Sequence, residues 1–173
     1  MSKTEQTFNL HNIDSPIGTL LLVTDVHGTL RALDFHDYEA RMHRLLRKHY
    51  GAIALTRIRT PHRLHSIFDR YFTGDIAALD ALECATNGTQ FQQMIWAALR
   101  RIEAGQAITY GQLAARLRIS SAARAVGFAN GANPIAIVVP CHRLIGANGH
   151  LTGYAGGLHR KRWLLDHERR ALR

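Results

Sequence analysis

A stretch with little hydrophobic periodicity, residues 73–90, divides this chain of 173 residues into two halves. Residues 1–90 carry ten Lys or Arg and ten Asp or Glu, whereas residues 91–173 carry twelve and three, so the whole formal net charge of +9 lies in the second half. A change in charge balance at a connecting segment indicates a domain boundary. We predict an N-terminal domain at 1–82, a linker at 83–87 and a C-terminal domain at 88–173.

The basic excess of the second half suggests a polyanionic partner, because a localised positive charge attracts nucleic acid. A basic surface without a partner would give the same charge, so charge alone leaves both interpretations open. Apolar residues make up 46% of the chain, which is enough for a folded core. The sequence has no apolar run long enough to cross a membrane, and its start lacks a signal-peptide core. We therefore expect a cytoplasmic protein without membrane association. We also expect it to be monomeric, without an obligate protein partner.

The first half combines strands with amphipathic helices. Residues 8–35 have the pattern of strands and turns, with an apolar strand at 20–23 and a second at 30–35, expected as a hairpin. Residues 38–50 have a helical pattern. A clearer helix is predicted at 62–72, where apolar side chains recur at i, i+3, i+4, i+7 and i+8.

The second half contains a candidate helix-turn-helix. A helix near 91–102 precedes two short helices, at 110–117 and 122–130, joined by a short turn. Most short helix pairs are simply packed helices, but the second of these has small side chains except for Arg124 and Phe128. Small side chains let a helix backbone approach a groove closely, with Arg124 as a long cation that reaches in.

Cys141 follows a short β-branched run, residues 135–139, which we predict to be a buried strand. Pro140 restricts the backbone just before the thiol, and His142 and Arg143 follow it. Positive neighbours favour the reactive thiolate form of a cysteine. Cys84 has none of these features and is expected to be structural.

A general base for Cys141 is available in His142. Adjacent side chains of an extended chain point to opposite faces, so a water-mediated link is easier than a direct contact. A carboxylate would orient the far side of the imidazole. The final predicted helix, residues 158–168, follows a glycine-rich loop at 146–157 and supplies two candidates, Asp166 and Glu168, between which the residues alone do not choose.

The sequence predicts neither a metal site nor a cofactor. It has two cysteines and eleven histidines but no CxxC or HxxxH pattern. The pair His62 and His65 lacks a cysteine or carboxylate pattern that would complete a four-ligand site. No phosphate-binding glycine motif is present.

The string Ile137-Val-Val-Pro-Cys-His-Arg-Leu-Ile145 resembles the acceptor-cysteine signature of the O6-alkylguanine-DNA alkyltransferases, also called methylated-DNA–protein-cysteine methyltransferases, and most closely their bacterial Ogt-type members. The resemblance extends over about residues 86–169. Further motifs occur in the family's order and spacing: Thr89-Gln-Phe-Gln92, Ile108-Thr-Tyr-Gly111, Ala122-Ala-Arg-Ala-Val-Gly127, Asn133-Pro134, Gly153-Tyr-Ala-Gly-Gly157 and Lys161-Arg-Trp-Leu-Leu165.

The resemblance implies an α/β (α+β) fold, with a ribonuclease-H-like N-terminal domain and a C-terminal winged-helix or helix-turn-helix domain. It implies that the partner is double-stranded DNA containing O6-alkylguanine, bound in the minor groove with the damaged base flipped out. The alkyl group would pass irreversibly to Cys141 in a single turnover, without a cofactor. O4-alkylthymine is a second candidate substrate.

The same resemblance assigns catalytic roles. Cys141 matches the alkyl acceptor, His142 the base linked to it through water, and Glu168 the carboxylate that orients this base. Asn133 matches a hinge residue before the acceptor segment. Tyr110 matches the residue that assists guanine departure and lies near the flipped nucleotide's phosphate.

Arg124 matches the finger that takes the place of the flipped base. Other predicted DNA contacts are Tyr110, Ala122, Ala123, Gly127, Arg143 and Tyr154. The predicted substrate pocket comprises Val139, Tyr154, Ala155, Gly156 and Lys161. Some members have a serine where Ala155 stands, so here only the backbone amide is available to the alkylated oxygen. Some members also bind zinc in the N-terminal domain, but this half has only Cys84, so no zinc is expected.

Two other functions are compatible with parts of the pattern. Related proteins bind alkylated DNA without repairing it, but they lack the acceptor cysteine that is present here as Cys141. A Cys–His hydrolase would act through many turnovers, and the adjacency of Cys141 and His142 disfavours a direct catalytic pair.

Overall fold

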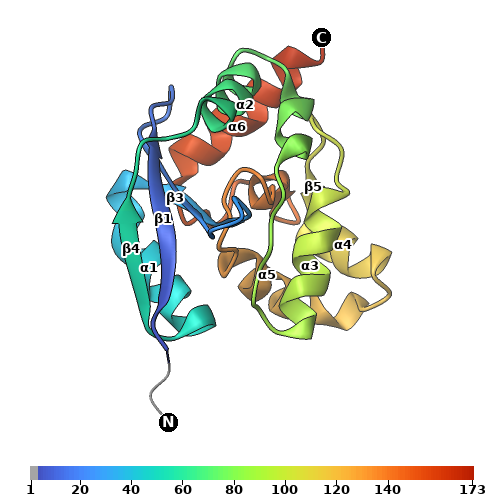
Figure 1. Cartoon of the computed structure of the whole chain (residues 1–173). Helices are drawn as coiled ribbons and strands as arrows, with labels where there is room; N and C mark the ends of the chain where they lie inside the picture. The colour runs from blue at the N-terminus through green and yellow to red at the C-terminus, as the bar shows by residue number, and fades with distance from the viewer. Residues whose placement is uncertain (1–3) are drawn as a thin grey trace. The chain divides into compact units, whose positions relative to one another are not determined.

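The structure is a computed structural model that describes residues 4–173, arranged in two compact units (Figure 1). The first unit contains the chain up to Asn87 together with Pro134–Val138, and the second contains Gly88–Asn133 and Val139–Arg173. The chain therefore leaves the second unit for five residues just before Cys141, a crossing that the predicted domain limits did not include. None of the helices formed by residues 4–173 is long and apolar enough to cross a membrane.

The first unit is built on a four-stranded sheet of β1 (Gln6–Ile13), β2 (Leu20–Thr24), β3 (Leu30–Phe35) and β4 (Ile53–Arg57), in the order β3-β2-β1-β4. Strands β1, β2 and β3 are antiparallel, which confirms the predicted hairpin, and β4 pairs parallel to β1. Strand β4 is not predicted from the sequence, because this five-residue strand is only partly buried and shows no clean alternation.

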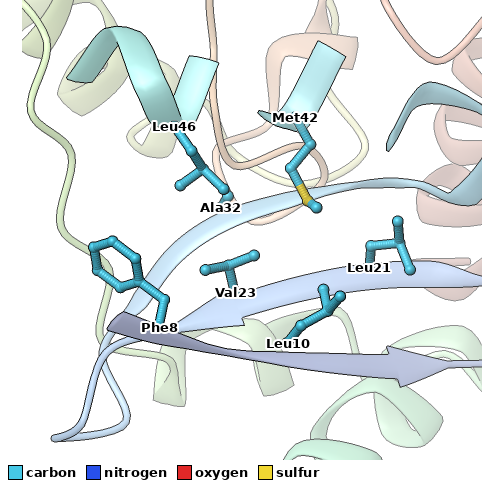
Figure 2. Close-up of a cluster of buried hydrophobic side chains, with 7 residues drawn as sticks. All are labelled: Phe8, Leu10, Leu21, Val23, Ala32, Met42 and Leu46. Carbon is cyan, nitrogen blue, oxygen red and sulfur yellow. The ribbon is translucent and has the colours of Figure 1, made fainter. Parts of the chain in front are cut away.

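Helix α1 (Glu39–Tyr50), which follows the 3-10 turn η1 (His36–Tyr38), forms the predicted amphipathic helix. Its buried side chains Met42 and Leu46 point toward one face of the sheet, as Figure 2 shows. They pack with side chains of three strands, namely Phe8, Leu10, Leu21, Val23 and Ala32. The register places Leu10 opposite Val23 and Val23 opposite Ala32. Because side chains alternate between the two faces along each strand, these residues all lie on the same face of the sheet.

The predicted helix at 62–72 is present as α2 (His62–Phe72), whose apolar stripe is buried. The connection beyond it is more ordered than the lack of periodicity indicated. It contains the 3-10 segment η2 (Ile76–Ala81), which packs against α2 and buries Ile76 and Leu79. A 3-10 turn this short does not produce the helical period on which the prediction relied.

The second unit contains α3 (Gln90–Arg100), α4 (Tyr110–Arg116), η3 (Ser120–Ala122) and α5 (Ala123–Gly131). Capping boxes begin α3 and α4, where Thr89 and Thr109 each accept a hydrogen bond from the backbone N–H three residues later. Helix α5 packs against both α3 and α4, and the Trp96 indole N–H donates a 2.8 Å hydrogen bond to the Ala129 carbonyl. The two helices predicted as a helix-turn-helix are thus adjacent in space.

The rest of the second unit holds the acceptor segment. The 3-10 turn η4 (Cys141–Arg143) leads into β6 (Leu144–Ile145), which pairs parallel to β5 (Ile108–Thr109) at the start of α4. Residues 146–157 form no helix or strand, as predicted, and α6 (Leu158–Ala171) ends the chain. The small sheet of the first unit and the helical second unit confirm the predicted α/β class.

The prediction of a strand at 135–139 was wrong. Only Ile135 forms a bridge, to Leu33 of the first unit, and the next residues turn. Val138 donates its N–H to the Ala136 carbonyl at 2.7 Å, around Ile137 with a φ of 68°. A β-branched residue rarely takes this conformation, which costs of order 1–3 kcal/mol. The apolar run thus indicated burial correctly but not backbone conformation.

Candidate active site

Cys141 is held by a second tight turn. Pro140 has φ −80° and ψ 65°, and the Cys141 N–H donates a 2.8 Å hydrogen bond to the Val139 carbonyl. These values describe an inverse γ-turn, to which the proline ring is suited because it restricts φ. The cysteine is 7% exposed and neither cysteine of the chain forms a disulfide. The structure therefore presents Cys141 at a constrained turn that starts η4, not at the end of a strand.

Two asparagines at the end of α5 support this turn. The buried Asn133 amide donates a 2.8 Å hydrogen bond to the Val139 carbonyl and so closes the excursion of Pro134–Val138. The amide of Asn130 donates to the Cys141 carbonyl at 3.4 Å. The family resemblance predicts a role for Asn133, whereas no role was predicted for Asn130. A polar residue on the buried face of an otherwise small, apolar helix was the available signal.

His142 and Glu168 form a buried pair. The imidazole Nε2 lies 2.8 Å from Oε1 of Glu168, and both side chains have no exposed surface. Arg143 binds the same carboxylate from the other side, with Nε 2.9 Å from Oε2 and Nη2 2.9 Å from Oε1. Its Nη1 donates to the Ile102 carbonyl. Glu168 is thus fixed by three charge-assisted contacts.

The protonation of this group follows from its contacts. Burial would raise the pKa of Glu168, but the charge of His142 and the hydrogen bonds from His142 and Arg143 outweigh it and hold the pKa far below its ordinary value. Glu168 is therefore a carboxylate, which only accepts hydrogen bonds, so Nε2 of His142 carries a proton. When His142 is neutral, its lone pair therefore lies on Nδ1, a buried atom that bonds to no protein atom of residues 4–173.

Arg143 requires a correction. The resemblance predicts that Arg143 contacts DNA. In the structure its side chain is buried, with 8% exposure, and its guanidinium donates hydrogen bonds to the Glu168 carboxylate and the Ile102 carbonyl. The motif places an arginine beside the thiol but does not reveal its direction. Of the two carboxylates that the residues left open, Asp166 is exposed and lies 3.9 Å from Arg169, whereas Glu168 contacts His142.

Tyr110 and Lys161 meet at one carbonyl of the glycine-rich loop. The Tyr110 hydroxyl and the Lys161 ammonium each donate a 3.1 Å hydrogen bond to the Thr152 carbonyl, and Lys161 also donates to the Gly153 carbonyl at 3.2 Å. Helix α4 and helix α6 thereby hold the same point of the loop. The role of Thr152 could not be predicted, because any residue supplies a backbone carbonyl.

Cys141 is electrostatically linked to these two residues. Burial raises the pKa of Tyr110, the hydrogen bond to Thr152 opposes this, and the charge of Cys141 raises it further. Burial lowers the pKa of Lys161 to about 8, while the charge of Cys141 acts in the opposite direction. The attraction between the Lys161 ammonium and a Cys141 thiolate is mutual, so Lys161 favours the nucleophilic form.

Three of the other predicted pocket residues, Tyr154, Ala155 and Gly156, belong to this loop, and Val139 lies two residues before Cys141. Tyr154 and Ala155 are half-buried, whereas Gly156 and Val139 are buried. The Gly156 carbonyl accepts a 3.0 Å hydrogen bond from Arg160, one turn into α6. Helix α6 therefore contacts the second half of the loop at two points, through Lys161 at Thr152 and Gly153 and through Arg160 at Gly156.

Four of the predicted DNA-contacting residues lie on η3 and α5. Arg124 is exposed near the start of α5, and Ala122, Ala123 and Gly127 are half-buried. A Cβ added at Gly127 would lie 3.8 Å from the Tyr110 ring, an ordinary contact distance. Within the described part of the chain, no three His, Cys, Asp or Glu side chains form a group that could hold a metal ion.

Comparison with known proteins identifies similar chains. Residues 90–170 match the family described as 6-O-methylguanine DNA methyltransferase, DNA binding domain. The methylated-DNA–protein-cysteine methyltransferase of Salmonella typhimurium is 53% identical over 158 residues, which cover 90% of this chain and 92% of that protein. The Mycobacterium tuberculosis protein of the same name is 44% identical over 164 residues, covering 91% and 90%.

Two solved structures extend this similarity to the fold. Mycobacterium tuberculosis OGT in complex with DNA matches with a TM-score of 0.77 and 38% identity, over 94% of each chain. The O6-methylguanine-DNA methyltransferase of the archaeon Pyrococcus kodakaraensis matches with a TM-score of 0.69 and 26% identity, over 93% of this chain and 98% of that one.

Proposed function

Because this chain belongs to the methylated-DNA–protein-cysteine methyltransferase family, we propose that it repairs DNA by moving the alkyl group of O6-alkylguanine onto its own Cys141. The observation that carries this proposal is the arrangement around the thiol. Cys141 is followed directly by His142, which is oriented by the buried carboxylate of Glu168 at 2.8 Å.

The reaction balances with the groups present. His142 accepts the thiol proton on Nδ1, through a bridging water. The Cys141 thiolate attacks the alkyl carbon, a C–S bond forms, and the C–O bond breaks with its electron pair going to guanine. Guanine takes a proton from the Tyr110 hydroxyl, and the proton that left Cys141 restores Tyr110 through solvent. The product is a thioether, and none of these side chains reverses it, so each molecule acts once.

The DNA supplies the substrate from inside a stacked duplex, so the damaged nucleotide must rotate outward at a cost of a few kcal/mol. Arg124, exposed on α5, would offset part of this cost by entering the space the base leaves. The basic second half provides phosphate contacts that do not depend on sequence. The small side chains of Ala122 and Ala123 permit the close approach that minor-groove binding needs.

Intact-protein mass measured before and after mixing with an O6-methylguanine duplex tests the transfer. We expect the mass of one methyl group to be added, mapped to Cys141, and no second turnover. Cys141→Ser should abolish the gain while duplex binding persists, and Cys84→Ser serves as the matched control with full transfer. An unchanged mass, or a methyl group on another side chain, would refute the proposal, and many turnovers would indicate a hydrolase.

The finger role of Arg124 is tested by comparing two substrates. Arg124→Ala should slow repair of duplex DNA far more than reaction with free O6-alkylguanine, because only the duplex needs a base displaced. Arg100→Ala, which removes an exposed arginine from α3, is the control. Equal losses on both substrates would exclude this role.

Competition with an O4-methylthymine duplex and with undamaged DNA would define which damaged bases the protein repairs. Sedimentation would test whether the protein is monomeric.

A further inference from the structure

We propose that Phe128 is a second probe of α5, an apolar side chain that enters the minor groove beside Arg124 and contacts the base pairs next to the flipped nucleotide. The inference rests on the proposed function. Its starting observation is that Phe128 is 75% exposed, whereas Ile95, Trp96 and Leu99 on the neighbouring helix α3 are buried.

The position of Phe128 on α5 gives it a direction. Val126, Ala129 and Asn130 face the interior of the second unit, and Arg124, Phe128 and Gly131 are spaced i, i+4 and i+7 on the opposite face. Phe128 therefore projects from the same exposed face as the proposed finger. No residue of α5 other than Arg124 and Phe128 has a long side chain on this face.

Apart from Arg124, the neighbours of Phe128 on this face of α5 are small, so its ring protrudes beyond them. Ala125 is exposed and small, and a Cβ added at Gly131 would have nothing within 4 Å. The backbone of α5 can therefore approach a partner closely on both sides of the ring. Exposed Arg116, the last residue of α4, and exposed Arg118, two residues further on, add positive charge to the same helix pair. An aromatic ring among cations and small residues matches the apolar edges and phosphates of a DNA groove.

The spacing fits neighbouring base steps. Residues four apart on a helix are separated by about 6 Å along its axis. This distance lies between one and two base steps of about 3.4 Å. With Arg124 in the vacated base position, Phe128 meets the adjacent base pairs, where a ring can wedge between sugars and base edges and hold the step open.

The test uses Phe128→Ala, with Phe128→Leu as the conservative variant and Val26→Ala, which trims an equally exposed apolar residue in the first unit, as the matched control. We expect Phe128→Ala to slow methyl transfer from duplex DNA about tenfold. Reaction with free O6-benzylguanine and the thermal unfolding midpoint should not change. Phe128→Leu should recover part of the duplex rate, and Val26→Ala should behave as wild type.

A second readout does not require transfer. The fluorescent base 2-aminopurine is placed next to O6-methylguanine in a duplex, and the Cys141→Ser variant is added so that no methyl group is transferred. We expect the 2-aminopurine fluorescence to rise when this variant binds. The rise should be much smaller when the variant also carries Phe128→Ala. Equal brightening with both would overturn the inference, as would a monomer–dimer equilibrium without DNA that depends on Phe128. If wild-type protein gains no methyl group, the proposed function fails instead, and the fluorescence comparison still decides whether Phe128 enters the groove.

Discussion

Nε2 of His142 donates a 2.8 Å hydrogen bond to Oε1 of Glu168, and neither side chain reaches the surface. This contact determines the tautomer of the imidazole and leaves the Nδ1 lone pair to accept a proton. The guanidinium of Arg143 balances the negative charge of the buried Glu168 carboxylate from its other side. The three residues form one electrostatic unit in which each depends on the other two.

Loss of the Glu168 charge should weaken both stability and reaction. Glu168→Gln removes the anion that His142 and Arg143 share, and we expect the free energy of unfolding to fall by about 3 kcal/mol because a buried cation loses its partner. Methyl transfer should also slow, because an amide no longer requires Nε2 to carry the proton. Urea unfolding and single-turnover kinetics measure both effects. Asp166→Asn, two residues away and exposed, should change neither, and matching results for the two variants would contradict the assignment.

The same carboxyl predicts an acid-dependent loss of stability. Folding lowers the pKa of Glu168 below its ordinary value of 4.5, so its contribution is complete above that pH and is lost as the pH falls below it. The difference in unfolding free energy between wild type and Glu168→Gln should therefore be constant near neutral pH and narrow in acid. Urea titrations from pH 7 to about pH 3 provide the measurement. A difference that stays constant over this range would argue against an ionised Glu168 in the native state.

Lys161 should make the reaction rate dependent on pH. Its pKa is lowered to about 8, so its charge, and its attraction for a Cys141 thiolate, are lost as the pH rises through that value. Lys161→Met should slow transfer most below pH 8 and less above it, because the wild-type protein has then lost the same charge. Arg162→Met removes an exposed cation one residue along α6 and should leave the pH profile unchanged. Parallel profiles for wild type and Lys161→Met would be inconsistent with this effect.

Arg118 combines backbone strain with a charged side chain. It is the second residue after the end of α4 and has a φ of 60°, a conformation that costs an L-residue roughly 1–2 kcal/mol and that glycine adopts freely. Arg118→Gly should raise the free energy of unfolding by about 1 kcal/mol and weaken DNA binding, because a positive charge that attracts phosphates is lost. Arg116→Gly removes the same charge from inside α4 and should instead lower stability, by roughly 0.5–1 kcal/mol. Similar stability changes in both variants would show that strain at Arg118 is unimportant.

The local parts of the fold could be predicted from the sequence, because they depend on residues close together along the chain. The apolar stripe of α2 follows from hydrophobic periodicity, whereas the second helix of the helix-turn-helix was predicted from its small-residue composition. The burial of the Arg143 side chain could not be predicted, since its partner Glu168 lies 25 residues further along the chain. The turn at Ile137 was also missed, because a β-branched apolar run has the same composition whether it is a buried strand or a buried turn.

The five-residue excursion of Pro134–Val138 limits how the protein can be divided. A truncated variant beginning at Gly88 would keep Cys141, His142 and Glu168, yet Ile135 would lose its bridge to Leu33. The apolar side chains of the excursion would then face water immediately before the nucleophile. Although Cys141, His142 and Glu168 all belong to the second half of the chain, the segment that leads to Cys141 is anchored on a strand of the first half, so a fragment without residues 1–87 would lack that anchor.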